Sequence, residues 1–449
     1  MNALARLMIV AGWLVVAAGL VPAGASAAEA AGGAQTQEAL APDKIAERIA
    51  ACRTAEVTLT LTGADGKPLA GKAVNVRMVR HRFLFGCNGF KINPSDDSKA
   101  QRDYRERFAG LLNFATLPFY WGRYEPRLGQ TDAPHVEAMA RWCRDNGINT
   151  KGHPLCWHQV CPKWAADMDP NEVRKLQLAR ITREVKGFAG LIDKWDVVNE
   201  AVVMPNFERD TNPISKICRK IGQVEIIKET FGAARAANPS AVLLLNDYDT
   251  SPKYERLIEE CLKAGAAIDV IGIQSHMHAG YRGAAWAWEA CERFARFSKP
   301  LNFTELTITS GADSERKTVR WEGPNYTDWP TTPEGEARQA RQVEEFYTVL
   351  FSHPAVQAIT WWDFSDDRAW LGAPAGLVRK DMTPKPAYEA LLKLVKGKWW
   401  TPPQDLTTDS AGQVRFRGYL GDYEASWGGA KAAFQLDKPG TAAATLRPR

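Results

Sequence analysis

Apolar and polar residues follow one rhythm at the two ends of the chain and another between them. Residues 55–79 alternate apolar and polar positions on both sides of a turn at Asp65-Gly66, which predicts a strand, turn, strand unit. Residues 412–436 show similar short alternating strands broken by glycines. Because a β fragment with so few strands has too little core to be stable alone, we predict one small β appendage built from the N- and C-terminal segments.

Between these ends, eight apolar, strand-like runs recur, and helical segments such as 133–147 and 334–353 separate most of them. The runs begin near residues 81, 111, 148, 194, 241, 269, 300 and 355. Strands that alternate with helices predict an α/β fold with a parallel sheet, and eight such units favour a (β/α)8 TIM barrel. A doubly wound open sheet is the alternative, but it usually has fewer strands, and no G-x-G-x-x-G opens a helix here.

The first 28 residues have one positive charge, Arg6, then an apolar stretch and a small-residue end. This pattern is typical of a secretory signal peptide cleaved near Ala27 to Ala30. A membrane anchor is the alternative, although glycines and Pro22 interrupt the apolar run. We therefore expect a secreted or periplasmic protein with no membrane association once the signal is removed.

The remaining chain divides by composition into four further parts. Residues 29–50 are rich in Ala, Gly and Gln, and this composition predicts a linker. We expect the N-terminal β segment at 51–80, the catalytic barrel at 81–397 and the C-terminal β segment at 398–449.

The overall composition narrows the class of partner. The chain is 45% hydrophobic and 24% charged, with a formal net charge of +5 and no concentrated basic block, so nucleic acid is not an expected partner. Its sixteen tryptophans suit either a large core or a carbohydrate-binding cleft. Eight cysteines permit disulfides in an exported chain, with Cys156 and Cys161 close enough in sequence to bridge; buried free thiols are the alternative. We expect a monomer.

In a barrel of this kind the active site lies at the carboxyl ends of the strands. The residues at the predicted strand ends include His153, Trp157, His158, Asn199, Glu200, Asn246, Asp247, Gln274, His276, His278, Glu305, Trp361, Trp362 and Asp363. Any one of these residues taken alone more often has a structural role. Their convergence on one end of one barrel instead predicts a functional site.

Glu200 and Glu305 are the central pair. They are 105 positions apart, about three βα units of the usual roughly 30-residue barrel repeat, which predicts that they face each other across the cleft. Paired carboxylates that flank a bond are typical of glycoside hydrolysis. Crowding by a second carboxylate and by tryptophans would raise the pKa of an acid, and His276 is placed to hydrogen-bond the ionised partner. His153 and His158 lie five apart without H-E-x-x-H, so we expect no metal and no cofactor.

Seven motifs of the barrel resemble glycoside hydrolase family 10, the family of endo-β-1,4-xylanases. They are KGHPLCWH (151–158), WDVVNEA (195–201), LLLNDYD (243–249), IGIQSHMH (271–278), FTEL (303–306), TWWDFSDDRAWL (360–371) and PKPAYEAL (384–391). The resemblance implies that Glu200 is the acid/base and Glu305 the nucleophile of a retaining mechanism, with carboxyl groups about 5 to 5.5 Å apart.

The resemblance also implies the residues that contact the sugar. Asn199 would bind the hydroxyl next to the reacting carbon, while Gln274 and His276 would orient the two acids. The other residues that it implies in substrate binding are Asn113, His153, Trp157, Trp362 and Trp370.

The sequence departs from the family at two places. After the second strand, where the family has a Glu-Asn pair and a Lys that bind the glycone sugars, this chain has NFATLPFYWGRYEP. Thr307 stands where the family commonly has an Asp after the TEL motif. Replacing charged groups by aromatic ones should change which sugar binds. The expected partner is therefore a polysaccharide or oligosaccharide, with xylan as the leading candidate, another β-glycoside as the alternative, and a non-catalytic carbohydrate-binding barrel as a third interpretation.

The end segments leave one question open. The β appendage either braces the barrel or binds sugar itself, since Tyr419, Tyr423 and Trp427 would form an aromatic platform if their rings were exposed.

Overall fold

A computed structural model describes residues 27–312, 319–321 and 323–448 of the chain. The predicted signal peptide, 1–28, lies almost wholly outside these residues. Within the described part of the chain, no helix combines the length and the apolar character that crossing a bilayer requires.

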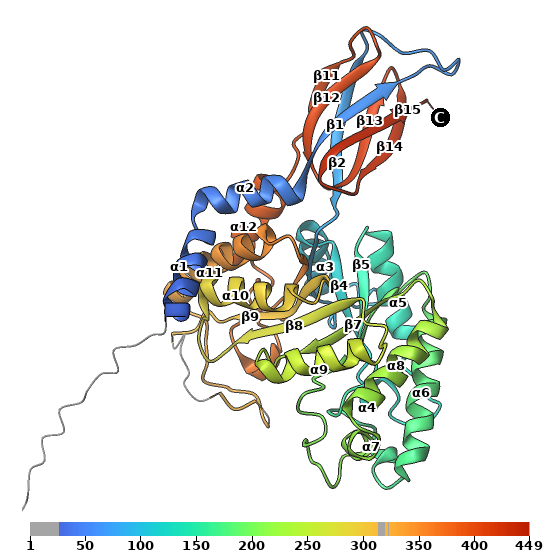
Figure 1. Cartoon of the computed structure of the whole chain (residues 1–449), viewed down its shortest axis with the longest axis vertical. Coiled ribbons are helices and arrows are strands. Elements are labelled where there is room, and N and C mark those ends of the chain that lie inside the picture. Colours follow the sequence, from blue (N-terminus) through green and yellow to red (C-terminus); the bar gives the residue numbers. More distant parts are fainter. Residues whose placement is uncertain (1–26, 313–318, 322, 449) are drawn as a thin grey trace, which may run out of the picture.

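Eight parallel strands form a closed barrel that is surrounded by helices (Figure 1). Each corresponds to one of the eight apolar runs, so the predicted (β/α)8 barrel is confirmed. In chain order the strands are β3 (Leu84–Asn88), β4 (Phe114–Pro118), β5 (Asn149–His153), β6 (Lys194–Asn199), β7 (Val242–Asp247), β8 (Val270–Met277), β9 (Leu301–Ile308) and β10 (Val356–Trp361), and β10 pairs with β3 to close the ring.

Helices cover the outside of the barrel because each has one apolar face. In α9, for example, Tyr254, Leu257, Ile258 and Cys261 recur at helical spacing and are buried. The long helices are α3 (Lys99–Leu111), α5 (Ala133–Asp145), α6 (Pro170–Gly187), α8 (Gln223–Ala237), α9 (Pro252–Lys263), α10 (Gly283–Ala295) and α11 (Pro333–Ser352). Shorter helical elements are α4 (Trp121–Tyr124), α7 (Pro213–Ile221), α12 (Pro386–Lys393), the 3-10 turns Lys163–Ala165 and Trp370–Gly372, and a π turn at Leu394–Lys398.

The strands of the barrel are closely packed below the site. All eight residues of β9 are buried, and Trp195 of β6 is fully buried. The ring of Trp195 lies so close to Gly152 of β5 that a Cβ there would come within 2.2 Å of it. A side chain at position 152 would therefore push apart the two strands that carry His153 and Glu200.

The segment predicted as a linker, 29–50, is instead helical. It forms most of α1 (Ala27–Ala39) and α2 (Pro42–Arg53). Arg53 ends α2 with a buried guanidinium that donates to the carbonyl oxygens of Phe351 at 2.7 Å and His353 at 2.6 Å. An Ala- and Gln-rich composition suits a helix as well as a linker, and docking on the end of α11 decides between them.

The predicted β appendage is confirmed, and it is built from both ends of the chain (Figure 1). One sheet has the order β12-β1-β15 and the other β11-β2-β13-β14. The strands are β1 (Thr54–Leu61), β2 (Ala73–His81), β11 (Gln404–Thr407), β12 (Gln413–Tyr419), β13 (Gly421–Trp427), β14 (Ala430–Leu436) and β15 (Gly440–Leu446).

The inner faces of the two sheets form a separate core, which contains Val57, Leu59 and Phe416. Tyr423 and Trp427 also belong to it, with only 1% and 6% of their surface exposed. They therefore do not form an exposed aromatic platform. The Tyr423 hydroxyl donates to the carbonyl oxygen of Tyr419 at 2.6 Å, so it too serves the packing of the appendage.

Candidate active site

A cleft of about 850 Å³ opens at the carboxyl ends of the barrel strands. Apolar side chains bury the strands along their length, but each strand ends on residues that face this cleft. The residues that line it are Asn88, Phe90, Lys91, Tyr120, Arg123, His153, Trp157, His158, Gln159, Val160, Asn199, Glu200, Val203, Phe207, Tyr248, Gln274, His276, Arg282, Glu305, Trp321, Asn325, Trp362, Asp363, Arg368, Ala369 and Trp370.

Glu200 follows directly after β6, where the backbone turns out of the strand. Its backbone φ of 54° lies in the left-handed region, which residues other than glycine rarely adopt. Its backbone amide donates to the carbonyl oxygen of Asn246 at 2.8 Å. The carboxylate accepts from Trp157 Nε1 at 2.9 Å and from Gln274 Nε2 at 3.3 Å. This turn directs an acid into the cleft at the tip of an otherwise buried strand.

Glu305 lies within β9, on the opposite side of the barrel from β6. Its Oε1 accepts from Asn246 Nδ2 at 2.8 Å, and its Oε2 is 3.0 Å from His276 Nε2. His276 Nδ1 is 3.0 Å from the Thr307 hydroxyl. The neutral tautomer with its proton on Nε2 satisfies both contacts, because it donates to Glu305 and accepts from Thr307.

Amide side chains connect the two glutamates. Asn246 donates both to Glu305 and, at 2.8 Å, to Asn199 Oδ1. Gln274 donates to the same Asn199 oxygen at 3.1 Å and to Glu200 at 3.3 Å. Buried networks of this kind hold their members in one arrangement, so the positions of the two carboxyl groups are fixed relative to each other.

The pKa values of the two glutamates move in opposite directions. Burial, followed by the negative charge of Glu305, raises the pKa of Glu200 to about 8. Burial alone would also raise the pKa of Glu305, but the hydrogen bond from His276 and the nearby basic groups, His153 ahead of Lys151, outweigh it and lower the pKa below its ordinary value. At neutral pH the site therefore holds one protonated and one ionised carboxyl group.

A buried ion network lies below Glu305. Asp196 Oδ2 is 2.6 Å from Lys151 Nζ and 2.7 Å from His153 Nδ1, and the three side chains are at most 1% exposed. Burial acts to raise the pKa of Asp196, but the positive Lys151 and the hydrogen bond from His153 hold it below its ordinary value. The network fixes the ring of His153 with Nε2 4.0 Å from Glu305.

Aromatic rings surround the carboxylates. Tyr120 has its ring centroid 5.5 Å from that of Trp157 and 5.6 Å from that of Phe90. Phe90 in turn lies 5.5 Å from Trp362. The flat, apolar faces of sugar rings pack well on such side chains, so the walls suit a carbohydrate.

Nine of the ten predicted site residues line this one cleft: His153, Trp157, Asn199, Glu200, Gln274, His276, Glu305, Trp362 and Trp370. Asn113, predicted to bind substrate, does not. It precedes β4 and so lies at the opposite end of the barrel, where its amide bonds the backbone amide of Phe85 at 2.8 Å and the carbonyl oxygen of Phe83 at 2.9 Å. Its side chain stabilises the start of the barrel sheet, and that prediction was wrong.

Sequence reasoning missed several lining residues that come from loops. Phe90 and Lys91 follow β3, Arg282 follows β8, and Trp321 lies in the long connection after β9. Their position just beyond a strand end was the available signal, but the sequence does not show which loop residues turn inward.

No group of three or more His, Cys, Asp or Glu side chains in the described residues is arranged to hold a metal ion. All eight cysteines, which the structure describes, are free thiols, Cys156 and Cys161 included.

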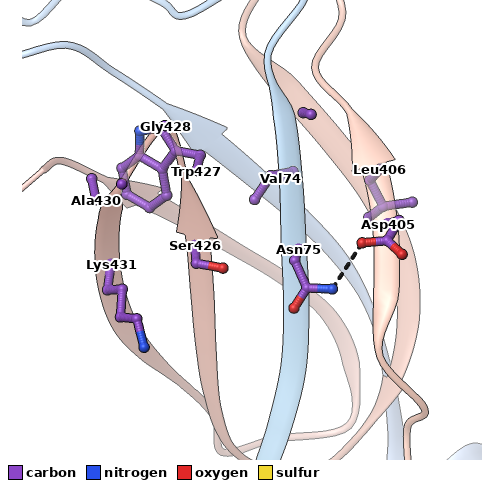
Figure 2. Close-up of a pocket in the computed structure, with 11 residues that line it drawn as sticks. Val74, Asn75, Asp405, Leu406, Ser426, Trp427, Gly428, Ala430 and Lys431 are labelled. Carbon is purple, nitrogen blue, oxygen red and sulfur yellow. Dashed lines mark hydrogen bonds between the residues drawn. The ribbon is translucent and has the colours of Figure 1, made fainter.

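The appendage carries a second, smaller hollow of about 390 Å³ (Figure 2). Asn75 Nδ2 donates to Asp405 Oδ1 at 2.8 Å across two neighbouring strands that border it. Lys431, on its far side, forms a 3.3 Å ion pair with Glu424. Both charged residues that line this hollow, Asp405 and Lys431, therefore already have a partner within the protein.

An eight-stranded barrel whose cleft holds a pair of buried glutamates, one protonated and one ionised, is an architecture of glycoside hydrolases. The chain belongs to glycosyl hydrolase family 10, whose model matches residues 114–394. This family membership confirms the resemblance.

Several xylanases are similar to this chain. Endo-1,4-beta-xylanase/feruloyl esterase from Xylanibacter ruminicola is 26% identical over 350 residues, covering 70% of this chain and 46% of that protein. Endo-1,4-beta-xylanase B from Paenibacillus barcinonensis is 29% identical over 300 residues, covering 64% of this chain and 87% of that protein. Anti-sigma-I factor RsgI6 from Acetivibrio thermocellus is 25% identical over 391 residues, covering 85% and 46%. The chain spans less than half the length of the first and third of these relatives.

Solved structures show the same fold. Xylanase 10B from Thermotoga petrophila in complex with xylobiose has a TM-score of 0.58 at 24% identity, over 71% of this chain and 95% of that one. A thermostable mutant of xylanase Xyn10A from Cellvibrio japonicus has a TM-score of 0.58 at 25% identity, over 70% of this chain and 98% of that one.

Proposed function

We propose that the protein is a retaining glycoside hydrolase that cleaves β-1,4-xylosidic bonds in xylan or a related β-linked plant polysaccharide. The observation that carries this proposal is the pair Glu200 and Glu305, held by one amide network with pKa values displaced in opposite directions. A glycosidic bond breaks through an acid that protonates the leaving oxygen and a carboxylate that attacks the anomeric carbon, and the two protonation states match these two roles.

In the first step, Glu305 attacks the anomeric carbon while Glu200 gives its proton to the departing oxygen. The product is a sugar ester of Glu305, and the leaving chain departs with the proton. Esterification removes the negative charge of Glu305, which is one of the causes of the raised pKa of Glu200. Glu200 therefore holds its proton less strongly in the intermediate and acts as a base.

In the second step, ionised Glu200 takes a proton from water, whose oxygen attacks the anomeric carbon and releases Glu305. Two displacements restore the original β configuration. Asn199, beside Glu200 and bonded to both Asn246 and Gln274, is proposed to bind the sugar hydroxyl next to the reacting carbon. His276 keeps Glu305 ionised and oriented for attack before the first displacement.

The remaining substrate contacts are proposed for His153, Trp157, Trp362 and Trp370. Family membership and the similarity to several xylanases support xylan as the substrate. The ring of Trp370 lies 4.6 Å from that of His276, and the ring of Trp362 lies 5.6 Å from it, so both tryptophans border the reacting centre.

A different β-glycoside is the second candidate. The observation that favours it is the aromatic segment after β4, where the ring of Tyr120 lies between those of Phe90 and Trp157. Sugars with an apolar substituent would suit this wall better than unsubstituted xylose.

Product analysis on glucuronoxylan, arabinoxylan and mixed-linkage glucan tests the proposal. Xylo-oligosaccharides released from the first two polymers, with retention of configuration by proton NMR of the first products, are expected. Turnover of an aryl β-glycoside with no product from either xylan would move the assignment to the second candidate, and first-formed α products would contradict the retaining mechanism.

We also propose export through the N-terminal signal, a single barrel domain over 81–397 and a monomeric state. The mass and N-terminal residue of the protein recovered from a host periplasm or medium test the first point, with a start between Ala27 and Ala30 expected. Light scattering of the same sample tests the last.

A further inference from the structure

The charged side chains around the cleft are unevenly distributed. Among the described residues that line it, the acids are Glu200, Glu305 and Asp363, all at most 9% exposed and close to the reacting centre. The remaining charged groups are all cationic: Lys91, Arg123, Arg282 and Arg368. The chain as a whole is nearly balanced, with 57 basic and 52 acidic residues, so composition alone does not account for this uneven distribution.

Two of the four cations are compensated within the protein. Arg368 forms a 3.1 Å ion pair with Asp367. Lys91 donates to the carbonyl oxygen of Asp367, and the charge of Asp363 acts to raise its pKa against the effect of burial. These two groups therefore already have partners for their charge.

Arg123 and Arg282 have no such partner among the described residues. The guanidinium of Arg123 lies over the ring of Tyr120, 5.7 Å from its centroid, and that of Arg282 lies 4.7 Å from the centroid of Trp286. Stacking on an aromatic ring orients a guanidinium while leaving its N–H groups free. Hydroxyl groups of a neutral polysaccharide need no charged donor, so two oriented, uncompensated cations beside the cleft point to an anionic group on the ligand.

We propose that the cleft takes an acidic polysaccharide, a xylan with uronic-acid side groups, and that Arg123 and Arg282 bind the carboxylates. The planar guanidinium matches a carboxylate with two parallel hydrogen bonds, which is the strongest form of this contact. Arg123 follows β4 and Arg282 follows β8, so the two stand on different sides of the cleft and meet side groups on different residues of the polymer.

This inference rests on the proposed function, since it assumes that the cleft accepts a xylan backbone. It adds that the side group is recognised rather than merely tolerated. The position of Arg123 next to Tyr120 ties the recognition to the segment in which this chain departs from its family.

The matched substrates are native glucuronoxylan and the same polymer with its uronic acids reduced to the neutral sugar. Backbone, branching and length are shared, and only the carboxylate differs. We expect kcat/KM of the wild-type protein to be about tenfold or more higher on the native polymer, the factor that one charge-assisted contact supplies. Raising the salt from about 0.05 to 0.5 M should shrink that ratio, because exposed charges are screened over a shorter distance.

Arg123→Gln and Arg282→Gln should each lower the native-to-reduced ratio, and the double variant should bring it close to one. The matched control is Arg141→Gln on α5, an exposed arginine that pairs with Glu137 away from the cleft. It should keep the wild-type ratio. The ratio compares two substrates on one protein, so a general loss of folding or activity does not change it.

Each result bears on one of the two proposals. Turnover of both polymers with equal kcat/KM, or a ratio that survives in the double variant, overturns the recognition by Arg123 and Arg282 and leaves the proposed function intact. No turnover of either polymer contradicts the proposed function. Calorimetric titration of a Glu305→Ala variant with the two polymers then still decides the recognition: tighter binding of the native polymer supports it, and equal affinity overturns it.

Discussion

The barrel cleft and the hollow on the appendage contrast in how their polar groups are used. In the cleft, Glu200 and Glu305 are buried, face each other's charge and have displaced pKa values. In the hollow, Asn75 and Asp405 are partly or fully exposed and bond each other (Figure 2). Polar groups that bond one another in water have little left for a ligand, whereas buried groups with displaced pKa values are arranged for chemistry.

The geometry of the two folds explains this contrast. A closed parallel barrel brings eight strand ends to one rim, so acids from β6 and β9 meet in a place that water reaches poorly. In the appendage, the large side chains Tyr423 and Trp427 point into the space between the sheets, and the outer face carries polar and charged residues such as Glu424 and Arg77, which pair with each other. We therefore expect substitutions in the cleft to change turnover and those in the hollow to change neither turnover nor binding.

Glu305→Ala should give the largest effect. Loss of the attacking carboxylate should reduce turnover by roughly 10⁴-fold or more. Azide should restore part of it by entering the vacated space, and attack from that face should yield the α-glycosyl azide, identified by NMR. Rates near those of the wild-type protein would exclude Glu305 as the nucleophile.

Glu200→Gln should have an effect that depends on the leaving group. On xylan, which needs its leaving oxygen protonated, the loss should be about 10² to 10⁴-fold, the usual contribution of a general acid. On an aryl glycoside with a nitrophenol leaving group, the first step needs little protonation and should lose much less. Equal losses on the two substrates would argue against the acid role.

The pH dependence sharpens the contrast between the two glutamates. The pKa of Glu200, about 8, should set the alkaline limb of kcat/KM, and Glu305 should set an acid limb below its ordinary pKa. Glu200→Gln should remove the alkaline limb only. If the alkaline limb persists in this variant, it reports the titration of a group other than Glu200.

The same pKa predicts an effect on stability. Because folding raises the pKa of Glu200 from 4.5 to about 8, the folded state binds the proton more tightly and stability falls as pH rises between these values. Glu200→Gln should therefore raise the free energy of unfolding at pH 8 by roughly 4 kcal/mol, since one pKa unit corresponds to about 1.4 kcal/mol, and leave it nearly unchanged at pH 4. Urea unfolding of both proteins at the two pH values measures this difference, and a destabilised variant at pH 8 would contradict it.

Asp405→Ala in the hollow should give the smallest effect. It breaks one hydrogen bond between partly or fully exposed groups, so the free energy of unfolding should fall by less than about 1 kcal/mol. Both kcat and KM on xylan should remain those of the wild-type protein. A changed KM on polymer but not on short oligosaccharides would show that the appendage binds polysaccharide. It would contradict the interpretation that only the barrel cleft binds a ligand.

The periodic patterns explain which parts of the molecule were predictable. Eight apolar runs became eight barrel strands, because a parallel sheet covered by helices buries both faces of each strand. The helices over 29–50 were missed, since an Ala- and Gln-rich segment carries no clear apolar face and gains its order from docking near Arg53. Asn113 was misplaced because a motif shows which strand a residue borders more readily than which end it occupies.

The sequence by itself determined the alternation of strands and helices, the β character of both ends, and the acids towards the carboxyl ends of β6 and β9, because these follow from local periodicity and motif spacing. Only the tertiary structure decided how those acids are used. Closure of the barrel brings Asn246, Gln274 and His276 from other strands onto the two carboxyl groups, and burial together with these contacts separates the two pKa values. Loop conformation likewise decided which cations face the cleft, since their orientation depends on rings such as Tyr120 and Trp286 with which they stack.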